Sequence, residues 1–372
     1  MYLFFGLGAF QAFLFSLLLI TKKEKRAADK FLAGFFFVIC LYLLNIYSVK
    51  YALWKGYPNI IIVITFVSLT YGPLLYFYVN SLIGRLITKK QLFFHSLPII
   101  TTIIVILPFM FYSNEEKWLY FTDKFINLPI NISIGTFLQY LSAPIYFIWI
   151  INILSKYNQN LKNNHSSIDK MSLSWMRKLL YGVISIWLID CINVYALNFT
   201  NFNVHYSISW IIKLTFIAFI ILIGYYGLNQ GSIFATTQQP KEKNNISSVK
   251  AKKLISDKIA KEYTDTLTSY MKNEKVYLNN EIRIQDISIS LNLPVHVLSH
   301  VINTKLNQNF YDFINSYRID EAKFRLLNEN YKQLTIVAIA FDCGFNSKAT
   351  FNRLFKQHTG LTPSQYKKKA IN

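Results

Sequence analysis

Seven apolar segments, each close to the length of a membrane-spanning helix, occupy most of the first 228 residues of this 372-residue chain. A helix crosses the hydrocarbon core of a bilayer with about 20 mostly apolar residues. Pro73 and Pro144 lie inside the third and fifth segments, where a kink packed against neighbouring helices would accommodate them. The sequence therefore predicts an all-α fold that begins with a seven-span transmembrane helical bundle over residues 1–228. The segments are residues 2–20, 31–48, 59–83, 92–112, 132–154, 179–199 and 208–228.

Lysine and arginine residues are distributed unevenly among the loops between these segments. Loops 21–30, 84–91 and 155–178 together hold 13 of them, whereas the loops on the opposite side hold four. Short cytoplasmic loops are rich in Lys and Arg. We therefore expect the N-terminus outside the cell and the chain after residue 228 in the cytoplasm. A cleavable signal peptide is not expected, because the first basic cluster follows the first apolar segment.

Charged residues are concentrated in the last third of the chain. Residues 241–372 carry 21 Lys and Arg and 12 Asp and Glu, whereas the longer stretch 1–240 carries 18 and 7. The whole chain is 53% hydrophobic and 16% charged, while typical soluble domains are roughly 25% charged. This composition excludes a disordered chain, a secreted disulfide scaffold and a simple cytosolic enzyme. The three cysteines form no CxxC or Cys/His pattern, so no metal site or cofactor is expected.

Two ionisable residues fall inside the predicted spans. Asp190 lies near the middle of the sixth segment, and Lys213 lies near the outer end of the seventh. A charge at membrane depth costs on the order of 3 kcal/mol, so a partner is expected. We expect the two side chains to pair, since their depths differ by about 6 Å of helix rise. The pair could form a signal site, or it could be a structural ion pair; alternatively, Lys213 could extend outward to the interface.

A polar stretch separates the apolar segments from the charged region. Residues 229–253 are rich in Asn, Gln, Ser, Thr and Lys and contain Pro240, which predicts a flexible linker. Residues 254–276 then predict an amphipathic connecting helix, whose apolar stripe needs a partner surface. That surface could belong to the same domain or to the same helix of a second chain, in a homodimer. The stripe consists of Leu254, Ile255, Ile259, Tyr263, Leu267, Tyr270 and Met271.

The last region, residues 277–372, contains a helix, a short turn and a second helix twice over. The first copy runs from Ile284 to Asn303 and the second from Thr335 to His358. In the second copy, Gly344 can adopt the positive φ of the turn, and Ser347 can cap the helix that follows. This is the helix-turn-helix plan, so a cytoplasmic helical domain with two recognition helices is predicted.

The outward faces of the two second helices carry hydrogen-bond donors and cations, and no carboxylate. Arg can bind guanine, Asn can bind adenine and a small Ala can contact a thymine methyl. A solvated polar face is the alternative, but two copies on a basic domain favour double-stranded DNA. A predicted helix over residues 310–327, about 27 Å long, would separate the two faces by nearly the ~34 Å between successive major grooves. The candidate DNA-binding residues are His296, Ser299, His300, Asn303, Lys348, Ala349, Asn352, Arg353 and Lys356.

The motifs of this region resemble the DNA-binding domain of AraC-type (AraC/XylS-like) transcription regulators. They are Asn309–Asn315, Tyr317–Ile319, Glu321–Lys323, Ala338–Ala340, Gly344–Lys348, Phe351–Lys356 and Thr359–Pro363. The similarity covers residues 277–370 and is closest in kind to Bacteroidetes-like variants fused to a multi-span membrane region. The resemblance implies a bacterial regulator that binds promoter DNA and contacts RNA polymerase. Pro294 departs from the pattern, because the family usually has a Ser or Thr cap there.

We therefore expect a sequence-specific DNA-binding transcription regulator in the bacterial inner membrane, in which the membrane part senses an unknown signal ligand. No catalytic residue is expected. One alternative is a membrane enzyme or transporter with a regulatory tail, although the sequence shows no Gly-rich phosphate loop and no inverted repeat. A second alternative is a scaffold whose helices bind other proteins. A steep salt dependence of DNA binding would distinguish the regulator from the scaffold.

Overall fold

The computed structural model describes residues 3–24, 26–122, 129–169, 171–197, 214–215, 217–228 and 257–371. The helices and turns of these residues confirm the predicted all-α class. The chain divides into two compact units. Unit 1 consists of residues 1–155 and 173–237, and unit 2 of residues 156–172 and 238–372. Residues 156–172, which the sequence assigns to a loop of the membrane part, therefore belong to the same unit as the C-terminal domain.

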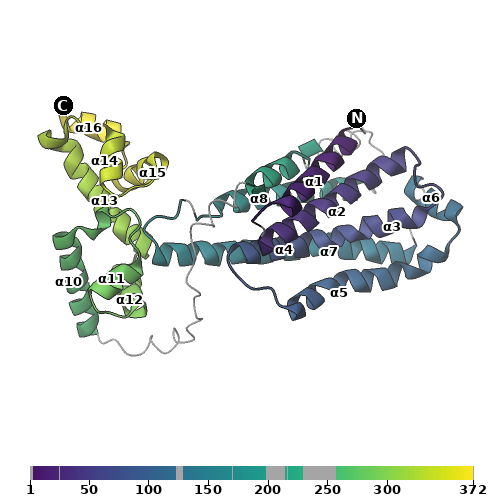
Figure 1. Ribbon diagram of the computed structural model, residues 1–372, viewed down its shortest axis with the longest axis horizontal. Helices are drawn as coiled ribbons and strands as arrows, with labels where there is room; N and C mark the ends of the chain where they lie inside the picture. Colours follow the sequence, from purple (N-terminus) through teal and green to yellow (C-terminus); the bar gives the residue numbers. More distant parts are fainter. Residues whose placement is uncertain are drawn as a thin grey trace. The chain divides into compact units, whose positions relative to one another are not determined.

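Unit 1 is built from long apolar helices (Figure 1). Within it, α1 packs against α2, and α2 packs against α4. Among the described residues, five segments are long and apolar enough to cross a membrane, and they correspond to the first five predicted spans: Leu3–Thr21, Ala27–Lys50, Pro58–Leu82, Lys89–Phe111 and Ile130–Asn164. The named helices are α1 (Leu3–Thr21), α2 (Ala27–Lys50), α3 (Pro58–Val67), α4 (Tyr71–Leu82), α5 (Lys89–Ile106), α6 (Asn114–Thr122), α7 (Ile130–Asn164) and α8 (Ser174–Leu197).

The sixth and seventh predicted spans are described less completely. The sixth corresponds to α8, which is not among the five segments that meet the length and hydropathy of a span. Of the seventh, residues 214–215 and a shorter apolar helix over Ile217–Leu228 are described. Lys213 and the predicted linker 229–253 lie outside the described residues. The count of seven spans therefore stays a prediction.

The third span is interrupted near its proline, as expected. A 3-10 turn, Ser68–Thr70, separates α3 from α4. Pro73 has no amide hydrogen to donate to the carbonyl of Leu69, so an α-helical bond is lost at this turn. Pro144, by contrast, lies within α7, which continues as a single helix.

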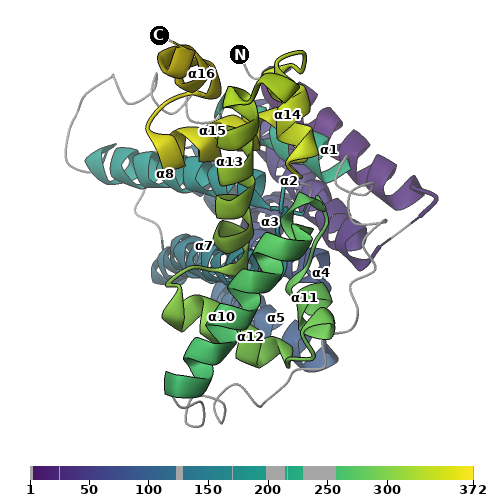
Figure 2. The same cartoon turned by 90° about the vertical axis from the view of Figure 1, so that its left-hand side faces the viewer.

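Unit 2 is arranged around α13 (Figure 2). Helices α10, α11 and α12 lie toward one end of α13, and α14, α15 and α16 lie toward the other. The predicted central helix 310–327 is confirmed by the bounds of α13. The helices of unit 2 are α10 (Asp257–Glu274), α11 (Ile284–Ser290), α12 (Val295–Lys305), α13 (Phe310–Leu327), α14 (Ile336–Asp342), α15 (Lys348–Thr359) and α16 (Pro363–Ile371).

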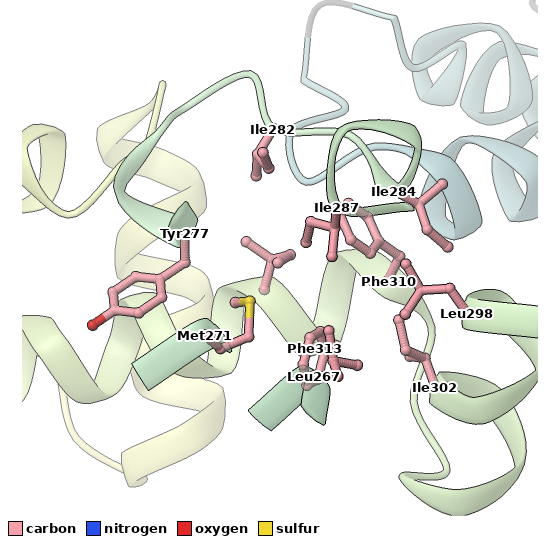
Figure 3. Packing of buried hydrophobic residues seen from close by; sticks show 11 residues of the cluster. Leu267, Met271, Tyr277, Ile282, Ile284, Ile287, Leu298, Ile302, Phe310 and Phe313 are labelled. Atoms are coloured by element: carbon pink, nitrogen blue, oxygen red, sulfur yellow. The ribbon is translucent and has the colours of Figure 1, made fainter. Parts of the chain in front are cut away.

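The second half of the apolar stripe of the predicted connecting helix is covered within its own unit, whereas Leu254 and Ile255 lie outside the described residues. Leu267 and Met271 of α10 are fully buried and pack with residues of α11, α12 and α13 (Figure 3). Ile259, which we expected on the stripe, is 41% exposed instead. The same chain covers Leu267 and Met271, so these two residues do not support the homodimer, the alternative that the sequence left open. The cluster consists of Leu267, Met271, Tyr277, Ile282, Ile284, Ile287, Leu298, Ile302, Phe310, Phe313 and Ile314.

Helix α13 also carries two buried charges. The Arg318 side chain is 1% exposed, and its guanidinium donates from Nε to the Tyr277 carbonyl (2.7 Å) and from Nη2 to the Asn279 carbonyl (2.8 Å). Burial lowers the pKa of the Arg318 guanidinium to about 10, so the group stays charged near neutral pH. The charge is therefore satisfied by backbone carbonyls of the segment that leads into α11.

Glu321 lies one turn further along α13 and is held by cations. Its carboxylate accepts hydrogen bonds from Arg325 Nε (2.8 Å), Lys275 Nζ (3.2 Å) and the Tyr277 hydroxyl (3.3 Å). Burial raises the pKa of the Glu321 carboxyl, but the hydrogen bonds from Arg325 and Lys275 outweigh burial, and the net shift is downward. This carboxylate therefore stabilises unit 2 in its ionised form.

Replacing Glu321 by Gln should destabilise unit 2 by about 2 kcal/mol at pH 7, because the group that accepts the hydrogen bonds from Arg325 and Lys275 loses its negative charge. A carboxyl with a lowered folded-state pKa contributes its stabilisation above its unfolded pKa and loses it as the pH falls through the folded pKa. The difference between wild type and Glu321→Gln should therefore shrink at acidic pH.

Hydrogen exchange of the solubilised full chain at pH 7 and at about pH 4 measures this difference. The adjacent Asp320→Asn, which breaks only an exposed pair with Lys323, is the matched control and should change little. Equal effects of the two variants would contradict the assignment.

Gly344, in the turn after α14, is fixed by two independent constraints. Its φ is +88°, a region that an L side chain enters at a cost of roughly 1–2 kcal/mol. A Cβ atom at this position would lie 2.7 Å from the Tyr277 carbonyl oxygen and 2.8 Å from that of Leu278. Gly360, which ends α15, also has a positive φ of +75°, but a Cβ there would meet nothing within 4 Å.

Gly344→Ala should therefore destabilise unit 2 by at least about 2 kcal/mol, since backbone strain and overpacking add. Gly360→Ala should be destabilised only by the backbone strain of the positive φ, because its Cβ would meet no other atom. Pulse proteolysis of the solubilised full chain in increasing urea compares the two variants. A Gly344→Ala protein that is as stable as Gly360→Ala would show that the close approach to residues 277–278 has been misassigned.

Candidate nucleic-acid interface

The first helix-turn-helix is formed by α11 and α12. The turn between them contains Asn292 with a φ of +51°, a conformation that Asn tolerates better than most residues. Helix α12 begins directly after Pro294, which provides no side-chain cap, as the departure from the family pattern predicted. Leu298, Val301 and Ile302 of α12 are fully buried, so the predicted inward face of this helix is confirmed.

The opposite face of α12 holds the first set of predicted site residues. His296 and Asn303 are exposed, and Ser299 and His300 are half-buried. The Asn303 amide donates to the Ser299 carbonyl (2.7 Å) and approaches the Ser299 hydroxyl (3.2 Å). The Asn303 amide thus donates within its own helix, whereas the His296 side chain is exposed to solvent.

The second helix-turn-helix is formed by α14 and α15. Both helices begin with a side-chain cap, and the cap at Ser347 was predicted. The Thr335 hydroxyl accepts from the Ala338 amide (3.1 Å) at the start of α14. The Ser347 hydroxyl accepts from the Thr350 amide (3.4 Å) at the start of α15. These bonds satisfy amides that a helix start leaves unpaired. Phe351, Leu354 and Phe355 of α15 are buried, as expected.

The outer face of α15 is basic. Lys348, Ala349, Arg353 and Lys356 are exposed and Asn352 is half-buried. Neither α12 nor α15 contains an acidic residue. Such a face suits phosphate oxygens and the acceptor atoms of guanine, so the chemistry expected from the sequence is present on a single helix surface.

Arg353 is additionally positioned from α13. Its Nη2 donates to the Tyr311 hydroxyl (3.2 Å), and Tyr311 is itself 2% exposed. The buried ring therefore orients the guanidinium, while other donors of the group are left for a ligand. Preorganisation of this kind lowers the entropy that binding must otherwise cost.

Sequence reasoning missed the roles of Tyr311, Arg318 and Glu321. All three fall within motifs that carry the family resemblance, but no function was assigned to them. A signal was available for Arg318, because it lies four residues after Ile314 and four before Ala322 on the apolar side of the predicted helix. A charge on a buried stripe predicts a specific partner. Three of its partners are the backbone carbonyls of Tyr277, Asn279 and Ser166, which no side-chain pattern reveals.

The ionisable residue of the membrane part lies beside a cavity in unit 1. Asp190 of α8 is half-buried and lines a cavity of about 270 Å³. The pairing of Asp190 with Lys213 is untested, because Lys213 lies outside the described residues. Among the described residues, no group of His, Cys, Asp and Glu could hold a metal ion. The other polar residues that line the cavity are Tyr42, Ser68, Tyr71, Gln139, Tyr140, Ser142, Tyr146 and Trp187.

Known proteins resemble about a quarter of this chain. Residues 287–369 match a family described as a helix-turn-helix domain. An uncharacterized HTH-type transcriptional regulator of Staphylococcus aureus is 32% identical over 93 residues, which are 25% of this chain and 12% of that protein. The HTH-type transcriptional activator RhaS of Mannheimia succiniciproducens is 26% identical over 85 residues, which are 23% of this chain and 31% of that protein.

Two further matches cover a similar share of the chain. The Msm operon regulatory protein of Streptococcus mutans is 27% identical over 93 residues, which are 25% of this chain and 32% of that protein. A solved structure from Listeria innocua, of a protein of unknown function, is 26% identical, with a TM-score of 0.25, and the match covers 28% of this chain and 94% of that one.

This chain spans 12% to 32% of the length of these curated relatives. The family match lies in the C-terminal region, at residues 287–369. Two helix-turn-helix copies, a basic recognition face and the matching family lead to the same conclusion. The C-terminal region of this chain is an AraC-type helix-turn-helix DNA-binding domain.

Proposed function

We propose that this chain is a membrane-embedded transcription regulator that binds double-stranded promoter DNA through α12 and α15. The observation that carries this proposal is α15, a capped helix whose exposed face is cationic and free of carboxylates, within a helix-turn-helix domain. Recognition helices of this class lie in the major groove, and their first turns contact base edges. Regulation of transcription is the activity named for the relatives.

The proposed roles follow the chemistry of each side chain. Arg353 would bind guanine in the major groove, and Asn352 would bind adenine. Lys348 and Lys356 would hold phosphates, and Ala349 would lie against a thymine methyl. In the first recognition helix, the base contacts would come from these residues: His296, Ser299, His300 and Asn303. Contact with RNA polymerase is part of the same proposal, since the domain type acts at promoters.

The membrane part is proposed to anchor the regulator in the bacterial inner membrane, with the C-terminal domain in the cytoplasm, and to sense a signal. Five apolar segments of spanning length support membrane insertion, and the distribution of Lys and Arg supports this orientation. The two further spans complete the seven-span proposal. The cavity beside Asp190 supports sensing, because it gives a small amphiphilic signal molecule a place to bind inside the bundle.

Replacing Arg353 by Ala should weaken binding to a specific DNA site by about 1–3 kcal/mol, or roughly 5-fold to 150-fold. Fluorescence anisotropy with a duplex selected by the full-length protein measures this loss. Lys332→Ala is the matched control, because it removes one exposed positive charge of the same domain outside the recognition helices. Similar affinities for both variants would contradict the role of Arg353. Weak dependence on salt between about 50 and 200 mM would favour the protein scaffold instead.

Asp190→Asn should alter reporter output several-fold in at least one growth condition, because a charge at membrane depth is expected to serve a specific partner. The solubilised variant should still bind DNA, since Asp190 belongs to unit 1 and not to the recognition helices. Asp265→Asn, an exposed carboxylate of α10, serves as the control. Output that matches wild type under every condition tested would reduce the membrane part to an anchor.

A further inference from the structure

A segment from the membrane part of the sequence is seated on the DNA-binding domain. Residues 156–172 comprise the end of α7 and the chain that follows it, and they belong to unit 2. His165 pairs with Arg283 in an isolated antiparallel bridge, and the Ser166 amide donates to the Ile282 carbonyl (3.2 Å). We call residues 162–169 the docking segment.

The centre of the docking segment is tied to α13. Ser166 is 1% exposed. Its carbonyl accepts from Arg318 Nη1 (3.2 Å) and from the Asn315 amide (3.2 Å), and its hydroxyl oxygen lies 3.1 Å from Arg318 Nη2. The guanidinium that holds the domain core therefore also binds this segment. A buried, charge-assisted contact of this kind is specific rather than incidental.

One end of the docking segment reaches the second helix-turn-helix, and the other end reaches α13. The Asn346 amide in the turn before α15 donates to the Ser167 hydroxyl (3.1 Å), and the Thr350 hydroxyl in the first turn of α15 donates to the Asp169 carboxylate (2.8 Å). At the other end, the Lys162 ammonium lies 5.7 Å from the centre of the Tyr311 ring, the ring whose hydroxyl orients Arg353.

This position conflicts with DNA. The first turn of a recognition helix enters the major groove and lies against base edges and phosphates. Asp169 places a carboxylate, an acceptor with negative charge, on that turn. The carboxylate would repel phosphates and would offer no donor to the acceptor-rich edge of guanine. The Asp169 carboxylate and a DNA duplex would therefore occupy the same space at the first turn of α15, and their negative charges would repel each other.

We propose that the docking segment is an intramolecular competitor of DNA, which covers the start of α15 until it is released. The partner of this surface is the end of α7 and the chain after it, so the last turns of a predicted spanning helix lead directly into the contact. The proposal rests on the proposed DNA-binding function. It assigns to the loop between the fifth and sixth predicted spans a role that its basic composition does not suggest.

The test uses the full-length protein in lipid nanodiscs and a mixed-sequence 30-base-pair duplex at about 50 mM salt, where phosphate contacts dominate binding. Cysteines replace Asp169 and Thr350, and a short bifunctional thiol reagent joins them. The joined protein should bind the duplex at least about tenfold more weakly than the same variant before treatment. Each single-cysteine variant, treated identically, controls for modification and for the native cysteines.

Asp169→Asn supplies a second, uncrosslinked measurement. It should raise affinity for the duplex several-fold more than Asp265→Asn, which removes the same charge from the exposed face of α10. Equal affinities of joined and unjoined protein, or equal gains from the two Asn variants, would overturn the competition. If none of these forms binds the duplex, the DNA-binding proposal itself fails, which is a distinguishable outcome.

Discussion

The buried guanidinium of Arg318 organises the DNA-binding unit, because its hydrogen bonds reach two segments that are distant from α13 in sequence. It binds the carbonyls of Tyr277 and Asn279 before α11, and Ser166 after α7. A buried charge without such partners would be strongly unfavourable. The guanidinium therefore fixes α13 against the segment that leads into the first helix-turn-helix. Gly344 lies so close to the carbonyls of Tyr277 and Leu278, in the segment that Arg318 binds, that only a residue without a Cβ fits.

Helix α13 also positions the two recognition helices. Its Tyr311 side chain orients Arg353 of α15, and its apolar face packs into the core that supports α12. The two recognition helices are thus held by one rigid element. The docking segment contacts the same element, so release of the segment and exposure of α15 can be coupled through α13 without an additional hinge.

Local pattern was sufficient to predict much of unit 2. The spacing of apolar residues located α13 with its observed bounds, and the capping residues Ser347 and Thr362 mark the starts of α15 and α16. These features depend on interactions within a few residues. The seating of Ser166 on Arg318 joins positions 152 residues apart, and no periodicity encodes it. The apolar stripe of α10 did not predict which surface covers it, because only tertiary packing decides whether that surface belongs to the same chain or to a second copy.

In unit 1, the sequence predicts the apolar segments but not how they pack together. Hydropathy located five segments of spanning length, because burial in lipid requires a continuous apolar surface. It does not specify which helices pack together or where a cavity forms. The polar residues around Asp190 come from α2, α4, α7 and α8 and from the 3-10 turn, so their convergence follows from packing alone. Predicting the signal ligand would require that packing as well.

The central claim is that α12 and α15 together read duplex DNA. Selection of genomic fragments by the full-length protein in lipid nanodiscs, followed by sequencing, tests it most directly. The account predicts enriched fragments that share a motif with two parts about 10 base pairs apart from centre to centre. It also predicts that a variant combining His300→Ala and Arg353→Ala loses this enrichment. Fragments with no shared motif, or a motif that survives both substitutions, would contradict the account.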